Sequence, residues 1–430
     1  MPKYTKKSRP PRNKTTKSGA DDSASIDDGV STCSNMSDVT SIYEDSEVGF
    51  PLGNDVILTS DSLDEKLDTS IEGLRNKDLR TRENYLRTLQ TLLSQKYVSE
   101  LVSNRIESLT EQLIACLRKG NESEGKLAAT VSSLVFIQLG EVDDELFLKF
   151  RDAILPTVRD ESKLSSLRKH YTQALGIICF ISSEEISSTV ELMKILETIF
   201  SPSYLSEDGA SPIINHDLQE LHTAALTSWC LLASTLPDNL AHELIRIYLP
   251  EKIPGLLETN DSDLRNQAGE TIAVLYEIAR DIHSIFAEPS ESLLITLEKK
   301  ANESAKYRGK KEKRLQRATF REIYNSFEEG TSPDFDIKFG RETLEITSWT
   351  SRFYYNMFSS ILATGMNVHL KENGFLRSVF NLDEPEIENL EQSKVNKLDR
   401  HNANKAAFKT RTQALNKTRA NKVRRNHYED

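Results

Sequence analysis

Apolar residues recur at helical spacing over most of the chain after about residue 66. Between Leu79 and Leu93, for example, Leu86 and Leu89 fall on the same face as the two ends of the segment. This is the pattern of an amphipathic helix. Similar stretches follow as GKLAATVSSLVFIQLG, SLRKHYTQALGIICFI, ELHTAALTSWCLLAS and LRNQAGETIAVLYEIA. The sequence therefore predicts five related helices.

These five helices align in one register. One column of the alignment holds a basic residue or a histidine at spacings of 46, 42, 54 and 43 residues; its members are Arg80, Lys126, Arg168, His222 and Arg265. Three positions later, Ala129, Ala225 and Ala268 occupy the equivalent place in three repeats, and small residues there allow neighbouring helices to approach closely.

A second apolar helix lies between each pair of aligned helices, in ESLTEQLIACLRK, DELFLKFRDAILPTV, VELMKILETIF and HELIRIYLPEKIPGLL. Two helices per period of about 42 to 46 residues are typical of HEAT or armadillo repeats. The predicted fold class is all-α: an armadillo/HEAT-like α-solenoid over residues 66–330.

Residues 331–385 have a different pattern. Alternating polarity in DIKFGRETLEITSW predicts two short strands around Gly340. A helix carrying Phe353 and Phe358 is expected to pack back on the end of the solenoid, and a shorter helix around 375–380 to close a small mixed C-terminal cap.

The two ends of the chain carry segregated charge. Residues 1–18 contain seven Lys or Arg and no acid, whereas residues 19–65 contain twelve Asp or Glu and no base. Residues 1–65 are predicted to be a disordered tail, because charge blocks with few apolar residues cannot bury a core. Its Ser/Thr-rich acidic run is either a phosphorylation tract or only solubilising.

Two basic segments stand out against the formal net charge of −11. Residues 394–425 hold eleven Lys or Arg and one acid, and we expect residues 386–430 to form a narrow basic helix with alanines between its charges. Residues 299–321 hold ten Lys or Arg. The candidate RNA-binding residues are Lys405, Lys409, Arg411, Lys417, Arg419, Lys422, Arg424 and Arg425 in the tail, and Lys310, Lys311, Lys313, Arg314 and Arg317 in the earlier segment.

Each basic segment also has a plainer interpretation. The tail is alternatively a solvated extension or a nuclear-import signal, and the earlier segment an exposed linker between helices. Local positive patches, rather than the net charge, attract polyanions. A thin helix of this kind is expected to fold on binding phosphates, with a log–log salt slope on the order of −4 to −7.

Catalytic chemistry is not evident in the sequence. The phosphate-binding, nucleophile and zinc motifs GxxxxGK[ST], GxGxxG, GxSxG and HExxH are missing. His216 and His222 are expected to have surface or capping roles, and Trp229 and Trp349 to be core residues. Cys33, Cys116, Cys179 and Cys230 form no CxxC pair and are interpreted as free thiols. No enzyme activity, cofactor, metal, membrane span or small-molecule substrate is expected.

Several segments together resemble a known family. The stretches KRLQRATFREI, IKFGRETLEITSW, GMNVHLKENGFLRSVF and RHNANKAAFKTRTQA are similar to the interferon-related developmental regulator family. The tail AAFKTRT and the segment FLRSVF are the most specific of these elements. The resemblance covers about residues 66–420 and departs in the tails and loops.

The resemblance implies a scaffold without catalysis and two alternative roles. One is a ribosome-binding translational regulator of idle ribosomes, in which the C-terminal helix occupies space lined by ribosomal RNA. The other is a nuclear transcriptional co-regulator that holds transcription factors and co-repressor proteins. The basic helix favours the first role, and a cytoplasmic and nuclear location is expected.

Overall fold

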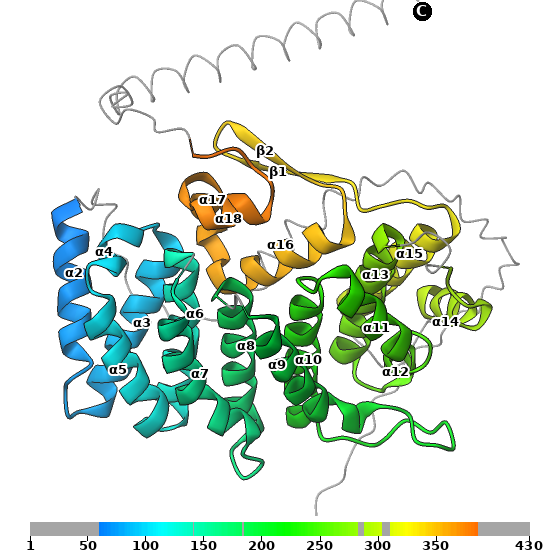
Figure 1. Cartoon of the computed structure of the whole chain (residues 1–430), viewed down its shortest axis with the longest axis horizontal. Helices are drawn as coiled ribbons and strands as arrows, with labels where there is room; N and C mark the ends of the chain where they lie inside the picture. Colours follow the sequence, from blue (N-terminus) through cyan, green and yellow to red (C-terminus); the bar gives the residue numbers. More distant parts are fainter. Residues whose placement is uncertain (1–59, 141, 183–184, 283–287, 303–309, 386–430) are drawn as a thin grey trace, which may run out of the picture. The chain divides into compact units, whose positions relative to one another are not determined.

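The computed structural model describes residues 60–140, 142–182, 185–282, 288–302 and 310–385, with side chains from Ser62 and, in the last of these ranges, from Gln316. The chain over these residues is a row of helix pairs followed by a cap (Figure 1). The fold class predicted from the sequence, an all-α armadillo-like repeat with a small mixed cap, is confirmed. None of the described helices is long and apolar enough to cross a membrane.

One set of helices packs side by side along the row. These inner helices are α3 (Leu79–Gln95), α6 (Glu122–Leu139), α8 (Ser165–Ser182), α10 (His216–Ala233), α13 (Ser262–Ile282) and α15 (Lys310–Glu328), and each contacts the next. The first five are the helices that the sequence register aligned.

A second helix packs against each inner helix. These outer helices are α2 (Ser60–Gly73), α5 (Ile106–Lys119), α7 (Asp144–Arg159), α9 (Ile186–Phe200), α11 (Asp238–Tyr248) with the short α12 (Lys252–Gly255), and α14 (Glu291–Asn302). The connections include α4 (Ser99–Ser103), η2 (Ser201–Ser203) and η3 (Leu256–Glu258). Helix α2 begins at Ser60, so the sequence-based prediction that disorder extends to residue 65 is wrong. The reason is that Leu67, Ile71 and Leu74 are buried in the core of the first pair.

Local sequence explains where the helices begin. Asp78, Asn121, Asp143, Asn215 and Ser348 each stand just before a helix and accept a hydrogen bond from a main-chain N–H of its first turn. Such a cap pairs a donor that has no partner within the helix and contributes about 1 kcal/mol.

Small residues set the spacing between inner helices. Ala129, Ala225 and Ala268 are fully buried, as the register predicted. At Gly176 of α8, a Cβ would lie 2.5 Å from the Cβ of Ser228 in α10, so only glycine permits this approach. The backbone of α8 therefore packs directly against the Ser228 side chain of the next repeat at this contact.

The basic column of the register has a structural role. Arg168 is buried and its Nε donates to the carbonyl of Val158 at the end of the preceding outer helix, at 3.1 Å. Arg265 donates in the same way to the carbonyl of Thr259, at 3.1 and 2.6 Å. Burial lowers the pKa of Arg168. These two arginines join α8 to the end of α7 and α13 to the end of η3 by satisfying main-chain carbonyls there.

The cap contains a hairpin and three helices. Strand β1 (Phe335–Phe339) pairs antiparallel with β2 (Glu342–Ile346), with Phe335 opposite Ile346, and Gly340 makes the turn at φ 61°. The helices are α16 (Trp349–Leu362), α17 (Met366–Glu372) and α18 (Gly374–Val379), with η5 (Ala363–Gly365) between the first two. The two predicted strands and the predicted helix around 375–380 are confirmed.

The position of the cap differs from the prediction. The cap was expected at the end of the solenoid, but α16 contacts α13, α6 and α3, α17 contacts α3, and α18 contacts α6. It therefore lies along the inner row, from its last repeats to its first (Figure 1). The physical reason is that its apolar residues, including Phe353, Phe358 and Leu362, join the same core as the inner helices.

Candidate interaction surface

Helix α15 carries residues 310–321 of the basic segment predicted from the sequence. Its buried side is formed by Thr319, Phe320, Ile323 and Ser326. Positions 310, 314, 317 and 321 are spaced by four, three and four residues, so they share one face of the helix, opposite the buried one. We call these four positions the basic face. It extends over about 16 Å of helix.

The predicted site residues are only partly covered by the structure. Arg317 is half-buried and Arg321 is exposed. Lys310, Lys311, Lys313 and Arg314 lie in the first two turns of α15, where the helix but not its side chains is described. The tail candidates Lys405, Lys409, Arg411, Lys417, Arg419, Lys422, Arg424 and Arg425 lie outside the described residues. An RNA-binding role for all of them stays a prediction.

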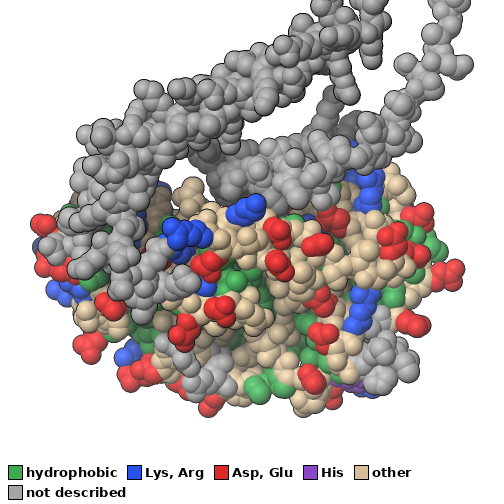
Figure 2. All heavy atoms as spheres, turned by 90° about the horizontal axis from the view of Figure 1, so that it is seen from above, with side chains coloured by type: hydrophobic (Ala, Val, Ile, Leu, Met, Phe, Trp, Pro, Cys, Tyr) green, Lys and Arg blue, Asp and Glu red, His purple; other side chains and the backbone are tan. Residues whose placement is uncertain are grey.

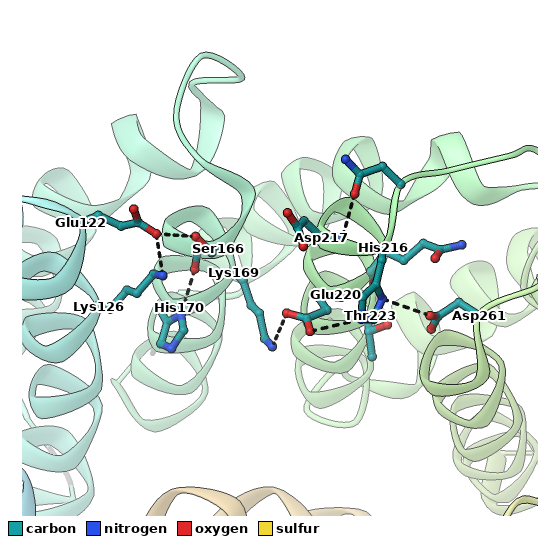
Figure 3. A network of polar contacts seen from close by, with 12 residues as sticks. Glu122, Lys126, Ser166, Lys169, His170, His216, Asp217, Glu220, Thr223 and Asp261 are labelled. Carbon is teal, nitrogen blue, oxygen red and sulfur yellow. Dashed lines mark hydrogen bonds and ion pairs between the residues drawn. The ribbon is translucent and has the colours of Figure 1, made fainter. Parts of the chain in front are cut away.

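The N-terminal halves of the inner helices carry a row of polar contacts, which we call the polar ladder (Figure 3). Glu122 of α6 accepts hydrogen bonds from Lys126 and from the hydroxyl of Ser166 in α8, both at 2.6 Å. Lys169 of α8 donates to Glu220 of α10 at 3.0 Å. Each rung joins two neighbouring repeats.

The ladder continues at both ends. His216 of α10 lies 3.7 Å from Asp261, which precedes α13, and is largely exposed. At the other end, Arg82 of α3 forms a two-bond ion pair with the buried Glu124 of α6, at 2.6 and 2.9 Å. Side chains with both charges are thus paired along the inner row.

The electrostatics of the ladder do not favour acid–base catalysis. The bonds from Lys126 and Ser166 lower the pKa of Glu122, and the bond from Lys169 lowers the pKa of Glu220. These carboxylates are therefore ionised at neutral pH and cannot donate a proton. Among the described residues, no three His, Cys, Asp or Glu side chains lie close enough together to hold a metal ion.

The cap is fixed to the first two inner helices by buried polar side chains. His369 is fully buried, and its Nε2 donates to the carbonyl of Leu93 at 3.1 Å. Asn373 donates to the carbonyl of Ile137 at 2.8 Å. Gln138 of α6 also donates to the Leu93 carbonyl, at 2.7 Å. The ends of α3 and α6 and the start of α18 are joined at this point.

A second set of contacts fixes the cap to α13. The carboxylate of Glu277 accepts bonds from the main-chain N–H groups of Trp349 and Thr350, at 2.9 and 2.8 Å, and from the Thr350 hydroxyl at 2.6 Å. An acidic group is favourable there because it faces the N-terminus of α16. Trp349 is buried and its indole donates to Ser326 at 3.0 Å, so its predicted core role is confirmed.

Arg377 joins three parts of the cap. Its guanidinium donates to the Glu342 carboxylate of β2 at 2.7 and 3.2 Å, to the carbonyl of Leu370 at 3.0 Å, and to the carbonyl of Asp383. A planar, forked donor suits such a junction. Arg377 is part of the segment FLRSVF, so this motif holds the cap together.

Sequence reasoning did not identify the residues that hold the cap on the solenoid. His369, Asn373 and Arg377 belong to the motif segment GMNVHLKENGFLRSVF, but Gln138 and Glu277 look like ordinary helical polar residues. Their partners are main-chain groups distant in the sequence, which leave no local pattern. The motif was the one available signal.

Most other predictions about single residues are confirmed. Cys116, Cys179 and Cys230 are buried free thiols, and burial raises the pKa of Cys116 to about 12. Trp229 is a core residue. The surface or capping role predicted for His222 is wrong, because this residue is buried inside α10, where its Nδ1 lies 2.6 Å from the Ser203 hydroxyl.

The face of the molecule seen in Figure 2 mixes charges of both signs. Acidic side chains are scattered over its visible part, with a smaller number of Lys and Arg between them. This part of the repeat surface thus offers a polyanion no continuous basic field.

Comparison with known proteins gives consistent matches over most of the chain. The family model for interferon-related developmental regulators matches residues 29–328, and that for the interferon-related protein conserved region matches residues 373–423. Human interferon-related developmental regulator 1 is 35% identical over 85% of this chain and 80% of its own length. Mouse interferon-related developmental regulator 2 is 32% identical over 75% of this chain and 74% of its own length.

Among solved structures, a computationally designed armadillo repeat protein for modular peptide recognition is similar to this chain. It has a TM-score of 0.34 and 17% identity, and the match covers 60% of this chain and 100% of that chain.

Proposed function

Because the chain belongs to the interferon-related developmental regulator family, we propose that it is a non-enzymatic regulator that binds the ribosome through its two basic segments. The repeats would dock on the ribosome surface, and the basic tail would enter space lined by ribosomal RNA. The consequence would be repression of translation on idle ribosomes.

The observation that carries this proposal is the basic face of α15. Its positions repeat every three to four residues opposite the buried side of the helix, so they share one side of α15 rather than being scattered around a linker. Rows of Lys and Arg neutralise phosphates and release counterions, which supplies affinity without base readout. In the polar ladder, lysines are paired with glutamates, so this part of the repeats is expected to bind a polyanion more weakly.

The test is sedimentation of the full chain and of a chain ending at Glu391 with purified 80S ribosomes, at low and moderate salt. The full chain should sediment with ribosomes and lose affinity steeply as salt rises, whereas the truncated chain should bind much more weakly. If both remain unbound at low salt, the ribosome proposal is wrong.

A second candidate function is a nuclear co-regulator that holds transcription factors or co-repressor proteins. The observation in its favour is the polar ladder, whose side chains from Glu122 to Asp261 lie at the N-terminal ends of α6, α8, α10 and α13. Charge reversal at Lys405, Lys409 and Arg411 separates the two functions. It should abolish ribosome binding and leave capture of protein partners by the repeats intact.

A further inference from the structure

The path from the repeats to the C-terminal tail runs through a short series of buried contacts. Asn373 donates to the Ile137 carbonyl at the end of α6 and, through its Oδ1, accepts from the N–H of Leu376 at 3.3 Å. It therefore both begins α18 and fixes that helix to the solenoid. Arg377 follows one turn later in α18 and is 2% exposed.

Arg377 binds the last described residues by its side chain and its main chain. Its Nε donates to the carbonyl of Asp383, and its own carbonyl accepts from the N–H of Leu382 at 2.9 Å. Just before these two residues, Asn381 has a left-handed backbone at φ 52°, which turns the chain back toward α18. Residues 380–383 are held against α18 as a result.

The other bonds of Arg377 fix the guanidinium itself. Glu342 accepts two of them from the hairpin, and Leu370 accepts one at the end of α17. Because these partners come from two separate elements, the group cannot rotate without losing charged, buried hydrogen bonds, which are worth more than neutral ones. The attachment point of the tail is thus tied to the whole cap.

We propose that Arg377 is a positioning residue for the basic tail: it holds residues 383–385 against the cap and so fixes the point from which the chain continues to the tail. The point of departure is a property of the free protein. Its consequence for RNA binding rests on the function proposed above. The match of residues 373–423 to one conserved region, which includes both Arg377 and the tail, agrees with their acting together.

The consequence follows from effective concentration. When two linked segments bind one target, a fixed tether presents the second segment at the right place, and added flexible length dilutes it. Loss of the Arg377 guanidinium would break the bond to the Asp383 carbonyl and release residues 383–385 as extra linker, whereas the main-chain bonds of Phe380, Asn381 and Leu382 would remain. We expect ribosome affinity to fall by about 2- to 3-fold, while the tail's own charges stay unchanged.

The first measurement uses the free full-length protein. Spin labels are placed at Glu372→Cys and Glu384→Cys, two exposed positions, with Cys33→Ser to remove one thiol; the three described cysteines are buried. The distance distribution between the labels should be narrow with Arg377 present and clearly broader in Arg377→Gln. Equal widths in the two proteins, whether narrow or broad, would overturn the proposal.

Matched variants separate positioning from loss of fold. Arg377→Lys keeps the positive charge but loses the planar guanidinium that donates to several acceptors at once. Glu342→Gln keeps the bonds of Arg377 to Leu370 and Asp383. Both variants should therefore broaden the distance distribution only partly. Arg352→Gln removes the other arginine–carboxylate pair of the cap, with Glu322, and should leave the distribution narrow. If Arg352→Gln broadens it as much as Arg377→Gln, the effect is general loosening and Arg377 has no special role.

The second measurement is affinity for purified 80S ribosomes. Arg377→Gln should bind about 2- to 3-fold more weakly than the unmodified chain. A Gly-Ser insertion of about three residues after Pro385 should cause a loss of the same size. A broader distribution in a protein that never binds ribosomes would support positioning and reject the proposed function. A broader distribution with unchanged ribosome affinity would reject the consequence drawn from it.

Discussion

The imidazole of His369 lies 3.1 Å from the carbonyl oxygen of Leu93, although the two residues are 276 positions apart in the chain. A carbonyl only accepts, so Nε2 carries the proton, and Nδ1 accepts from the amide of Asn373 at 3.2 Å. Both ring nitrogens are used by the neutral imidazole. A protonated ring would turn Nδ1 into a donor facing another donor.

Stability should fall at acidic pH because of this histidine and His222. Burial lowers the pKa of each to about 4, below the 6.5 of an exposed histidine. The unfolded chain binds protons first as pH falls, so stability is fully present above pH 6.5 and decreases below it. Below pH 6.5, each histidine should lower the free energy of unfolding by about 1.4 kcal/mol per pH unit, which amounts to about 2 kcal/mol at pH 5.

Urea unfolding at pH 7 and pH 5 measures this loss. His369→Gln should be less stable at pH 7 but should lose about 2 kcal/mol less than the unmodified chain between the two pH values. The surface variant His216→Gln is the control and should follow the unmodified chain. If His369→Gln shows the full pH dependence, His369 is not buried as a neutral ring.

Gly365 should be intolerant of alanine. A Cβ at this position would lie 1.8 Å from the carbonyl oxygen of Ser94 and 2.8 Å from the Cα of Gln95, so the cap would have to move away from α3. Overpacking against backbone costs about 1–3 kcal/mol. Thermal unfolding should show a clear drop in Tm for Gly365→Ala.

Gly374 provides the matched control for this test. It lies in the same cap, and a Cβ there would meet no atom within 4 Å. Gly374→Ala should leave the Tm unchanged or raise it slightly, because alanine reduces the freedom of the unfolded chain. Equal effects of the two substitutions would contradict a close approach of the cap to α3.

Glu277 should contribute to stability through its charge. It accepts three hydrogen bonds from the first turn of α16, and an amide at this position would lose the charge and one acceptor. We expect Glu277→Gln to lower the free energy of unfolding by about 1–3 kcal/mol. Denaturant titration checks this, with Glu345→Gln on the exposed side of β2 as the control that should change little.

Arg321 should affect ribosome binding without affecting the fold. It is exposed on the basic face of α15, so Arg321→Glu removes one phosphate contact and introduces repulsion. Ribosome affinity at low salt should fall several-fold, and the salt slope should become shallower by about one. Arg246 is exposed on outer helix α11, and Arg246→Glu is the control that should bind ribosomes like the unmodified chain. An equal loss of ribosome affinity in Arg246→Glu would show that only the net charge of the protein matters.

The repeat part of the fold could be predicted because its information is local and periodic. Apolar spacing identifies each helix, the Arg168 and Arg265 column sets the register between repeats, and small residues mark the close contacts. Helix pairs that contact mainly their neighbours in sequence need no further information. The strands beside Gly340 were predictable for the same reason, because alternation and a turn residue define a hairpin.

The sequence by itself determined the helices, their register, the buried tryptophans and cysteines, and the basic composition of α15. Only the tertiary structure decided where the cap lies and which residues hold it there. The bonds from His369 to Leu93, from Asn373 to Ile137 and from Arg377 to Asp383 end on main-chain carbonyls. Every residue has such a carbonyl, so its partner leaves no mark in the sequence, and the choice among them depends on how the cap's apolar side chains fit the inner row.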